Sequence, residues 1–138
     1  MADAVIITET KAWMVKAWRD LKMVQRAVAG QPPFYDMAVY HCQQSAEKAV
    51  KAFLVFQSRP YEKTHDIEVL VDLACAVEPR FSKLADAADA LTPYATRFRY
   101  PNSTFAVEPQ PAEYNEALQH AQTIYDFVLN LLPKEARP

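Results

Sequence analysis

Glycine is nearly absent from this sequence, since Gly30 is the only one among 138 residues. The phosphate-binding loops of the Walker and Rossmann types need several glycines, because their backbones approach the phosphate groups closely. A single glycine cannot build such a loop, so both classes of nucleotide-binding site are excluded. The ten prolines suit long helices joined by proline-marked corners.

Cysteine is also scarce, and long apolar runs are missing. Cys42 and Cys75 are isolated within helical patterns, which favours two buried free thiols over a disulfide or a zinc site. No apolar run approaches the roughly 18 residues that would span a bilayer. The opening MADAVIITETK is unlike a signal or transit peptide. We therefore expect a cytoplasmic protein that does not enter a membrane.

A strong excess of one charge is lacking too. The chain has 15 lysines and arginines against 17 aspartates and glutamates, which gives a net charge of -2. Any binding of nucleic acid must therefore come from a local basic patch. The hydrophobic fraction of 51% is typical of a globular protein, and a chain of 138 residues can bury a core of its own. We expect a single domain over residues 1–138.

Helical periodicity is what the sequence does contain. Apolar residues recur at i, i+3 and i+4 in five segments. These predicted helices cover about residues 8–29, 33–58, 66–77, 82–98 and 112–132. No window alternates apolar and polar residues convincingly, as a strand would. Because short corners imply antiparallel neighbours, the sequence predicts an all-α fold, an up-and-down helical bundle with a fifth, partly separate helix.

Glycine and proline positions mark the expected helix ends. Gly30 should cap the first helix, and the Pro32–Pro33 pair suits the first turn of the second. Pro60 should end the second helix, because a proline biases the preceding residue away from helical geometry. Thr64 is the expected N-cap of the third helix, and Pro93 should kink or break the fourth. A loop rich in turn formers, residues 100–113, precedes the last helix.

Metal and hydrolase chemistry find little support in the sequence. The histidines lack the spacing of a metal-binding helix, and His41 is interpreted as a packing histidine. No nucleophile elbow is present, and neither a metal nor a cofactor is predicted. The acidic residues that might be considered are expected to be scattered on solvent faces without a catalytic role. They are Asp66, Glu68, Asp72, Asp86 and Asp89.

Two basic groups on the first two helices could contact phosphate or an acidic partner, or could form solvated faces. A solvated face is the preferred interpretation of both groups. The first is a stripe on the predicted helix 8–29, and the second shares a face with Glu47 opposite the apolar arc of the predicted helix 33–58. The stripe consists of Lys16, Arg19, Lys22 and Arg26, and the second group consists of Lys48 and Lys51.

The stretch TRFRYP, residues 96–101, is less ordinary. Its two arginines, Arg97 and Arg99, offer guanidinium forks for phosphate, and its rings, Phe98 and Tyr100, offer stacking surfaces for bases. A structural interpretation stands level with this one. In it the two rings anchor the end of the predicted helix 82–98, and the arginines complement its last carbonyls.

The stretch RPYEKTH, residues 59–65, separates Arg59 from His65 by five residues. Such a spacing occurs in metal-independent ribonucleases, and it can equally arise in a helix connector. Local physics favours the connector, because Pro60 ends one helix and Thr64 caps the next. In that interpretation, Lys63 and His65 could border a phosphate-binding surface that Arg97 and Arg99 complete.

Three segments in this order resemble the HEPN domain, whose name stands for higher eukaryotes and prokaryotes nucleotide-binding. They are YHCQQSAEKAVKAFL (40–54), KTHDIEVLV (63–71) and LTPYATRFRYP (91–101), and the resemblance extends over nearly the whole chain. It implies a four-helix up-and-down bundle with an extra helix. It also implies a homodimer, and frequently a minimal nucleotidyltransferase as the partner protein, in many cases as a toxin and antitoxin pair.

The ribonuclease branch of this family carries an R-x4-6-H motif, usually with a polar residue after the arginine. Here Pro60 follows Arg59, and the pair lies in the connector rather than in the later helical region. No histidine lies within six residues of Arg97 or Arg99, and no tyrosine stands two residues after His65. The chain therefore resembles the branch without the nuclease motif.

The leading hypothesis is a dimeric HEPN protein that pairs with a nucleotidyltransferase and offers a nucleotide- or RNA-binding surface. Its candidate residues are Lys48, Lys51, Lys63, His65, Arg97, Arg99 and Tyr100. The alternatives are a metal-independent ribonuclease toxin that uses Arg59 and His65, and a module whose role is oligomerisation alone.

Overall fold

The computed structural model describes residues 3–61, 63–101 and 108–138, so residues 102–107 of the predicted loop lie outside the described ranges. The helices are α1 (Ala4–Ala29), α2 (Tyr35–Phe56), α3 (Ile67–Cys75), α4 (Ala85–Leu91) and α5 (Pro111–Leu131), with shorter 3-10 helices at Pro79–Leu84, Thr92–Ala95 and Lys134–Ala136. The described residues contain no strand, which confirms the predicted all-α fold. None of their helices is long and apolar enough to cross a bilayer.

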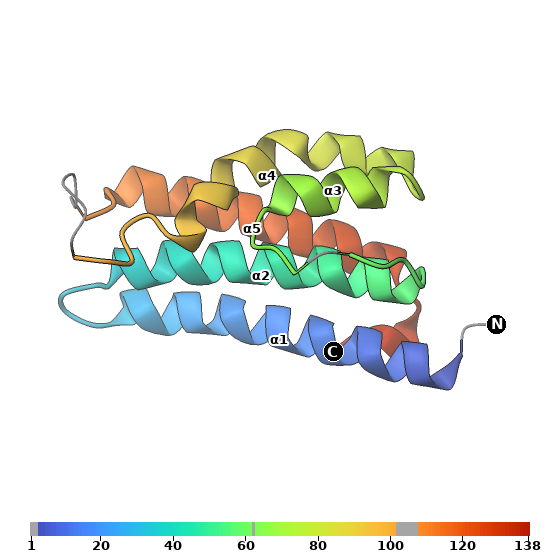
Figure 1. The fold of residues 1–138 in the computed structure, drawn as a ribbon. Helices are drawn as coiled ribbons and strands as arrows, with labels where there is room; N and C mark the ends of the chain where they lie inside the picture. Colours follow the sequence, from blue (N-terminus) through green and yellow to red (C-terminus); the bar gives the residue numbers. More distant parts are fainter. Residues whose placement is uncertain (1–2, 62, 102–107) are drawn as a thin grey trace.

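The direction of the chain identifies which helix is the additional one. In Figure 1, α1, α2, α4 and α5 alternate in direction, as in an up-and-down bundle. The helix α3 runs in the same direction as α2, because the described residues of the connector, 57–61 and 63–66, first run back along α2. The short corner between the second and third helices predicts antiparallel neighbours, and this prediction is wrong for α2 and α3. The connector reverses the direction of the chain without forming a helix.

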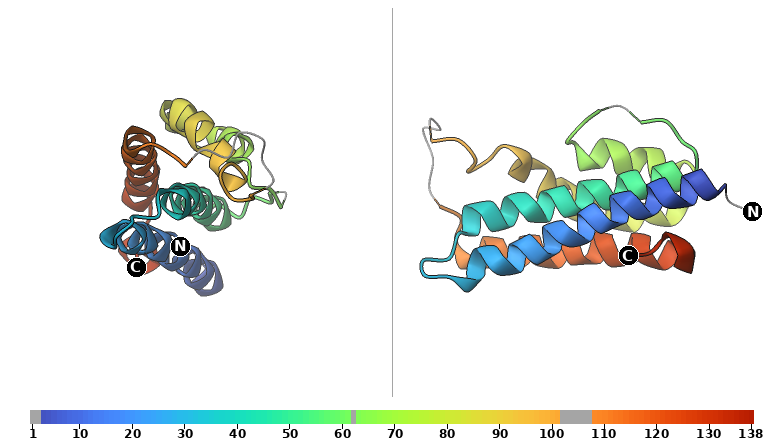
Figure 2. Two further views of the ribbon diagram at one scale, coloured as in Figure 1. Left: turned by 90° about the vertical axis from the view of Figure 1, so that its left-hand side faces the viewer. Right: turned by 90° about the horizontal axis from the view of Figure 1, so that it is seen from below.

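The helix α2 lies at the centre of the bundle and contacts α1, α5, α3 and α4. In the left view of Figure 2, α5 lies on one side of α2, and the described connector residues, 57–61 and 63–66, lie on the other. Many of its inward side chains are small, which lets neighbouring helices approach closely. The core around it is fully buried, and its larger members include Met14, Val24, Leu54, Leu70, Phe81 and Ile124.

Both cysteines are free thiols, as predicted, but their burial differs. Cys42 on α2 is fully buried, and burial raises the pKa of its thiol to about 12. Cys75, the last residue of α3, is only half-buried, so the predicted full burial is wrong there.

Two helix starts differ from the prediction. The helix α1 begins at Ala4 rather than near Thr8, because the Asp3 carboxylate accepts the Val5 N–H at 2.7 Å and caps it. The helix α2 begins at Tyr35, after both prolines, because the Phe34 N–H donates to the Ala27 carbonyl and closes the turn first. Phe34 itself is 56% exposed rather than part of the buried arc.

The fourth predicted helix is broken in two places. Pro79 opens a 3-10 helix that precedes α4, so the helical structure starts earlier than Ser82 but as a different type of helix. The α-helix ends at Leu91, and Pro93 lies in the following 3-10 helix, as the predicted break required.

The N-cap of α3 is Asp66 rather than Thr64. Its carboxylate accepts the backbone N–H groups of Glu68 and Val69, whereas the Thr64 hydroxyl accepts only the N–H of Asp66, which lies outside the helix. We therefore expect Asp66→Ala to lower the free energy of unfolding by about 1 kcal/mol in urea denaturation. Thr64→Ala should cost less, and the reverse order would show that the cap is misassigned.

Candidate functional site

The part of the polar side of α2 around Glu47 is covered by Tyr61 and His65 of the connector instead of facing solvent. Glu47 is 3% exposed, and its carboxylate accepts hydrogen bonds from Gln43 Nε2 at 3.1 Å and Lys51 Nζ at 2.9 Å, and it meets His65 Nδ1 at 2.8 Å. A buried carboxylate needs such partners, because its desolvation is costly. These four side chains, Gln43, Glu47, Lys51 and His65, form the Glu47 cluster.

Lys51 is enclosed by this arrangement. It is 8% exposed, and its ammonium lies 5.6 Å from the Trp13 ring centroid and 5.7 Å from that of Tyr61. Burial is the largest cause of a raised Tyr61 pKa, and the negative charges of Glu9 and Glu47 add to it. The predicted solvated face is therefore wrong for Lys51, because Tyr61 and His65 fold back over it. A buried, paired ammonium is not available to a phosphate.

His65 is the exposed end of the Glu47 cluster. Its side chain is 70% exposed, while Nδ1 meets the Glu47 carboxylate and its backbone carbonyl accepts from Gln43 Nε2 at 2.9 Å. In a neutral imidazole whose Nδ1 donates to a carboxylate, the other ring nitrogen, Nε2, is left as an acceptor. The structure thus orients an accessible imidazole with a buried carboxylate behind it. This geometry suits hydrogen bonding to a ligand or proton transfer.

A second buried carboxylate lies between α1 and α2. Asp20 of α1 is 6% exposed and binds His41 Nδ1 at 2.8 Å and Lys48 Nζ at 2.7 Å. His41 is therefore a packed, hydrogen-bonded histidine, as the sequence predicts. Lys48 is occupied by this ion pair and points toward α1, which separates it from the other candidate residues.

The segment 96–100 turns sharply after α4. Phe98 has a left-handed backbone with φ of 67°, a rare conformation for an aromatic residue, and its ring stacks on Tyr94 at 6.1 Å. The Arg97 guanidinium lies 4.6 Å from the Phe98 ring centroid. The Arg99 guanidinium lies 4.5 Å from the centroid of Tyr40 on α2. The structural interpretation therefore holds for Phe98, whose ring anchors the turn. The Tyr100 ring is 53% exposed and remains open for stacking.

Arg97 and Arg99 do not complement the helix carbonyls. Neither guanidinium forms a hydrogen bond or an ion pair with a residue in the described ranges, although both contact aromatic faces. A guanidinium on a ring keeps its N–H groups in the plane of the fork and open to an anion. These arginines are therefore available for a ligand.

His65 and Arg99 lie along the same side of α2. Arg99 lies over Tyr40 and His65 binds Glu47, and these two α2 residues are seven positions apart, which is about 10 Å or two helical turns. The sequence predicts one surface from residues 63–65 and 97–99, and one residue of each segment, His65 and Arg99, contacts this side of α2. We call Lys63, His65, Arg97, Arg99 and Tyr100 the α2 surface; all five are exposed.

Arg59 is not placed beside His65. The Arg59 N–H donates to the carbonyl of Leu54 near the end of α2, whereas the His65 carbonyl meets Gln43. Eleven helical positions separate Leu54 from Gln43, which is about 16 Å along the axis. No described contact joins the Arg59 and His65 side chains, so the two residues face different parts of α2.

The carboxylates expected to be scattered are partly gathered. Four of them line a hollow of about 270 Å³ between α3 and α4, namely Glu68, Asp72, Asp86 and Asp89. The shared hydrogen bond with Asp89 is the main cause that raises the pKa of Glu68, with desolvation and nearby carboxylates adding to it. Within the described ranges, no group of three or more histidine, cysteine or acidic residues is arranged to hold a metal.

A raised carboxyl pKa predicts a pH dependence. The folded state holds the Glu68 proton more tightly than the unfolded state, so this cluster favours folding below the raised pKa and weakens it as pH rises through that pKa. We expect Glu68→Gln to raise the melting temperature slightly near neutral pH, with the gain shrinking in acid. Thermal unfolding of both proteins across a pH series measures this, and a lower melting temperature of the variant at neutral pH would contradict it.

The sequence hypotheses missed the interior role of Gln43, Glu47 and Asp20. A signal was present, because Gln43, Glu47 and Lys51 follow one another at four-residue intervals, which places them in one row of α2. Only the returning connector decides that this row is buried.

Known proteins resemble the chain over most of its length. A family model described as HEPN domain matches residues 10–131. The crystal structure of an archaeal HEPN homologue has 26% identity and a TM-score of 0.71, over 88% of this chain and 96% of that chain. A crystal structure of a Thermus thermophilus protein has 28% identity and a TM-score of 0.70, over 89% of this chain and 98% of that one. The comparison with curated proteins gave no match.

Proposed function

This chain belongs to the HEPN domain family, and we propose that within it the protein is a binding module that contacts a nucleotide or RNA through the α2 surface. The observation that carries the proposal is the placement of Arg99 and His65 along one side of α2, with Arg97 two residues before Arg99 and all three exposed. These exposed side chains can bind an anion without leaving the Glu47 carboxylate unpaired, because Glu47 remains paired with Lys51.

The chemistry of this surface fits a phosphate with an attached base. Guanidinium groups bind phosphate oxygens through paired N–H donors. Tyr100 offers an exposed ring for stacking, and His65 Nε2 offers a hydrogen-bonding group at the other end. The spacing of about 10 Å along α2 exceeds the roughly 3.4 Å between successive phosphates of one stacked strand, which favours a short RNA over a single phosphate.

A titration of labelled single-stranded RNA tests this function. We expect Arg97→Gln/Arg99→Gln to weaken binding by about tenfold or more and to flatten its salt dependence, because two phosphate contacts are lost. The matched control is Arg26→Gln/Lys83→Gln, which removes the same charge from exposed positions elsewhere. Equal loss in both variants would show that only net charge matters and would contradict a localised surface.

We further propose that the protein is a cytoplasmic homodimer and the partner of a minimal nucleotidyltransferase, in a pair of toxin and antitoxin type. The family resemblance motivates this proposal, and two pairs of exposed apolar side chains, Phe34 with Met37 at the start of α2 and Val69 with Leu73 on α3, offer positions for a protein contact. Light scattering on the purified chain, alone and mixed with a cognate nucleotidyltransferase, measures both assemblies. A monomer that forms no complex at micromolar concentration would count against the pairing.

A second candidate function is metal-independent RNA cleavage, and the Glu47–His65 contact is the observation that favours it. A histidine held by a buried carboxylate is a suitable general base for a 2'-hydroxyl. Cleavage of RNA in the presence of a chelator should then disappear in His65→Ala and decrease in Glu47→Gln. Cleavage that persists unchanged in His65→Ala would refute this function, and because Arg59 lies elsewhere on α2, Arg59→Ala should have little effect.

A further inference from the structure

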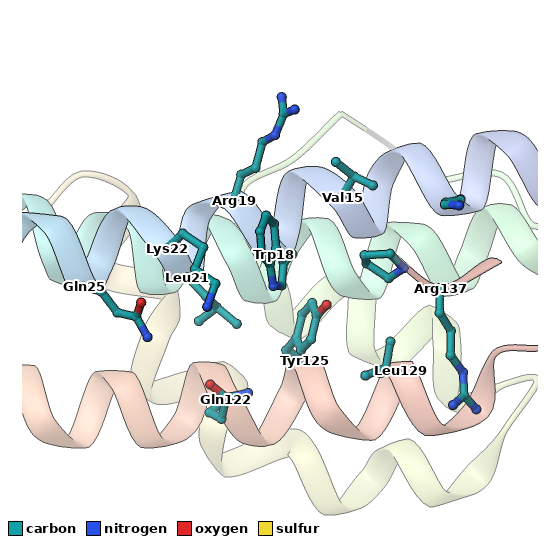
Figure 3. Close-up of a pocket in the computed structure, with 12 residues that line it drawn as sticks. Val15, Trp18, Arg19, Leu21, Lys22, Gln25, Gln122, Tyr125, Leu129 and Arg137 are labelled. Atoms are coloured by element: carbon teal, nitrogen blue, oxygen red, sulfur yellow. The ribbon is translucent and has the colours of Figure 1, made fainter. Parts of the chain in front are cut away.

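A groove lies between α1 and α5, away from the α2 surface. It has a volume of about 690 Å³, within the range of small-molecule sites. Trp18 and Tyr125 face each other across it from the two helices, and the C-terminal residues 137–138 close one end (Figure 3). Leu21 and Leu129 contribute apolar walls.

The groove has an exposed aromatic ring that packing alone does not explain. Trp18 is 42% exposed, while Tyr125 below it is 5% exposed and forms part of the floor. The Lys22 ammonium lies 5.2 Å from the Trp18 ring centroid, so a cation sits beside this exposed ring. An exposed indole with an adjacent ammonium can contact both a flat ring and an anionic group.

The charges around the groove are of one sign. Lys11, Lys22 and Arg137 line it, and none of its lining side chains is an aspartate or a glutamate. None of these three cations forms an ion pair within the described part of the chain. Arg137 is also oriented, because its Nε donates to the Leu132 carbonyl at 2.9 Å. In a chain of net charge -2, three cations around one hollow focus a local positive potential.

Arg19 belongs to the same rim but not to this cluster. Its side chain extends away from α5 (Figure 3). The basic stripe expected on the first helix is therefore divided by the fold: Lys22 borders the groove, Arg19 points outward, and Lys16 and Arg26 do not line it.

The charge pattern decides which occupant fits. A second copy of this face would place cations against cations, which disfavours a symmetric contact between two grooves. A ligand must instead carry negative charge for Lys11, Lys22 and Arg137, and a flat apolar part for Trp18. We propose that the groove between α1 and α5 binds a small organic phosphate whose flat ring lies against Trp18. This site is separate from the α2 surface and does not depend on its function.

Tryptophan fluorescence measures this binding directly. The chain has two tryptophans, so Trp13→Phe leaves Trp18 as the only reporter, and the phenylalanine keeps an aromatic ring beside Lys51. With adenosine triphosphate as the probe, we expect a saturable change in Trp18 emission. Adenosine alone and inorganic triphosphate alone should each bind at least about tenfold more weakly, because each lacks one of the two complementary parts.

Two charge-matched variants in this background make the test specific. Lys11→Gln/Lys22→Gln should lower the affinity for adenosine triphosphate by about tenfold or more, since charge-assisted contacts are lost. Lys16→Gln/Arg26→Gln removes the same charge from the same helix outside the groove and should leave the affinity nearly unchanged.

Arg97→Gln/Arg99→Gln distinguishes this site from the proposed α2 surface, and it should not alter the Trp18 signal. The inference is overturned if no saturable change occurs, or if both lysine variants are affected equally. It is also overturned if only Arg97→Gln/Arg99→Gln weakens the probe, because the ligand would then occupy the α2 surface.

Discussion

Glu47→Ala is expected to lower the free energy of unfolding by about 3–5 kcal/mol, since it leaves a buried ammonium without its carboxylate. Lys51 is 8% exposed and lies against two aromatic rings, so water cannot readily replace the lost partner. The change also removes the contact that holds His65 on α2. Urea denaturation at a single pH measures the effect.

The matched control for this change is Glu116→Ala on α5. Glu116 also contacts a histidine, His120, at 3.3 Å, but its side chain is 66% exposed. An exposed pair of this kind contributes roughly 0–1 kcal/mol, so the control should change stability little. The double variant Glu47→Ala/Lys51→Met should recover part of the loss, because no unpaired charge remains. If Glu47→Ala costs no more than Glu116→Ala, the cluster is not buried as described.

Phe81→Ala should have an effect of similar size for a different reason. Phe81 is fully buried, and its ring lies 4.6 Å from the centroid of Phe53 and 4.9 Å from that of Phe127. It joins the 3-10 helix before α4 to α2 and α5. Removing such a ring leaves a cavity and typically costs 3–5 kcal/mol. Thermal or urea denaturation compares the variant with the wild type.

Phe34→Ala provides the control for that prediction, because it deletes the same side chain at a position that is 56% exposed. We expect it to cost less than about 1 kcal/mol. Similar losses in the two variants would show that Phe81 does not connect the layers of the core.

The helices themselves could be predicted from the sequence because apolar periodicity depends only on local spacing. The long helices α1, α2 and α5 were placed to within a few residues, and the break at Pro93 followed from the missing N–H of proline. The errors lie at caps, where several residues compete. At the start of α3, Thr64 and Asp66 are both good caps, and tertiary geometry selects Asp66.

The candidate site could be predicted only in part, because burial of a polar row is a tertiary property. The spacing of Gln43, Glu47 and Lys51 showed that they share one side of α2. It could not show that Tyr61 and His65 return over that side, since the path of the connector depends on contacts with α1 and α2. Because the sequence does not reveal this path, it predicts a solvated Lys51, whereas the side chain is enclosed.

The separation of Arg59 from His65 shows the same limit. Five intervening residues could place the two side chains together on a turn, but Arg59 is held at Leu54 and His65 at Gln43, so packing along α2 keeps them apart. The placement of His65 and Arg99 on one side of α2 follows from the packing of both segments against that helix, which the charges of the sequence alone do not determine.

The proposed contact between the α2 surface and RNA involves a histidine, His65, that Glu47 holds. The chain has three histidines, His41, His65 and His120, so their side-chain resonances can be followed individually by NMR. During titration with a single-stranded RNA of about ten nucleotides, we expect the His65 imidazole signals to shift and saturate. Those of His120, on α5, should stay in place. Saturable binding that leaves His65 unperturbed, or shifts His120 alone, would show that RNA does not bind at the α2 surface.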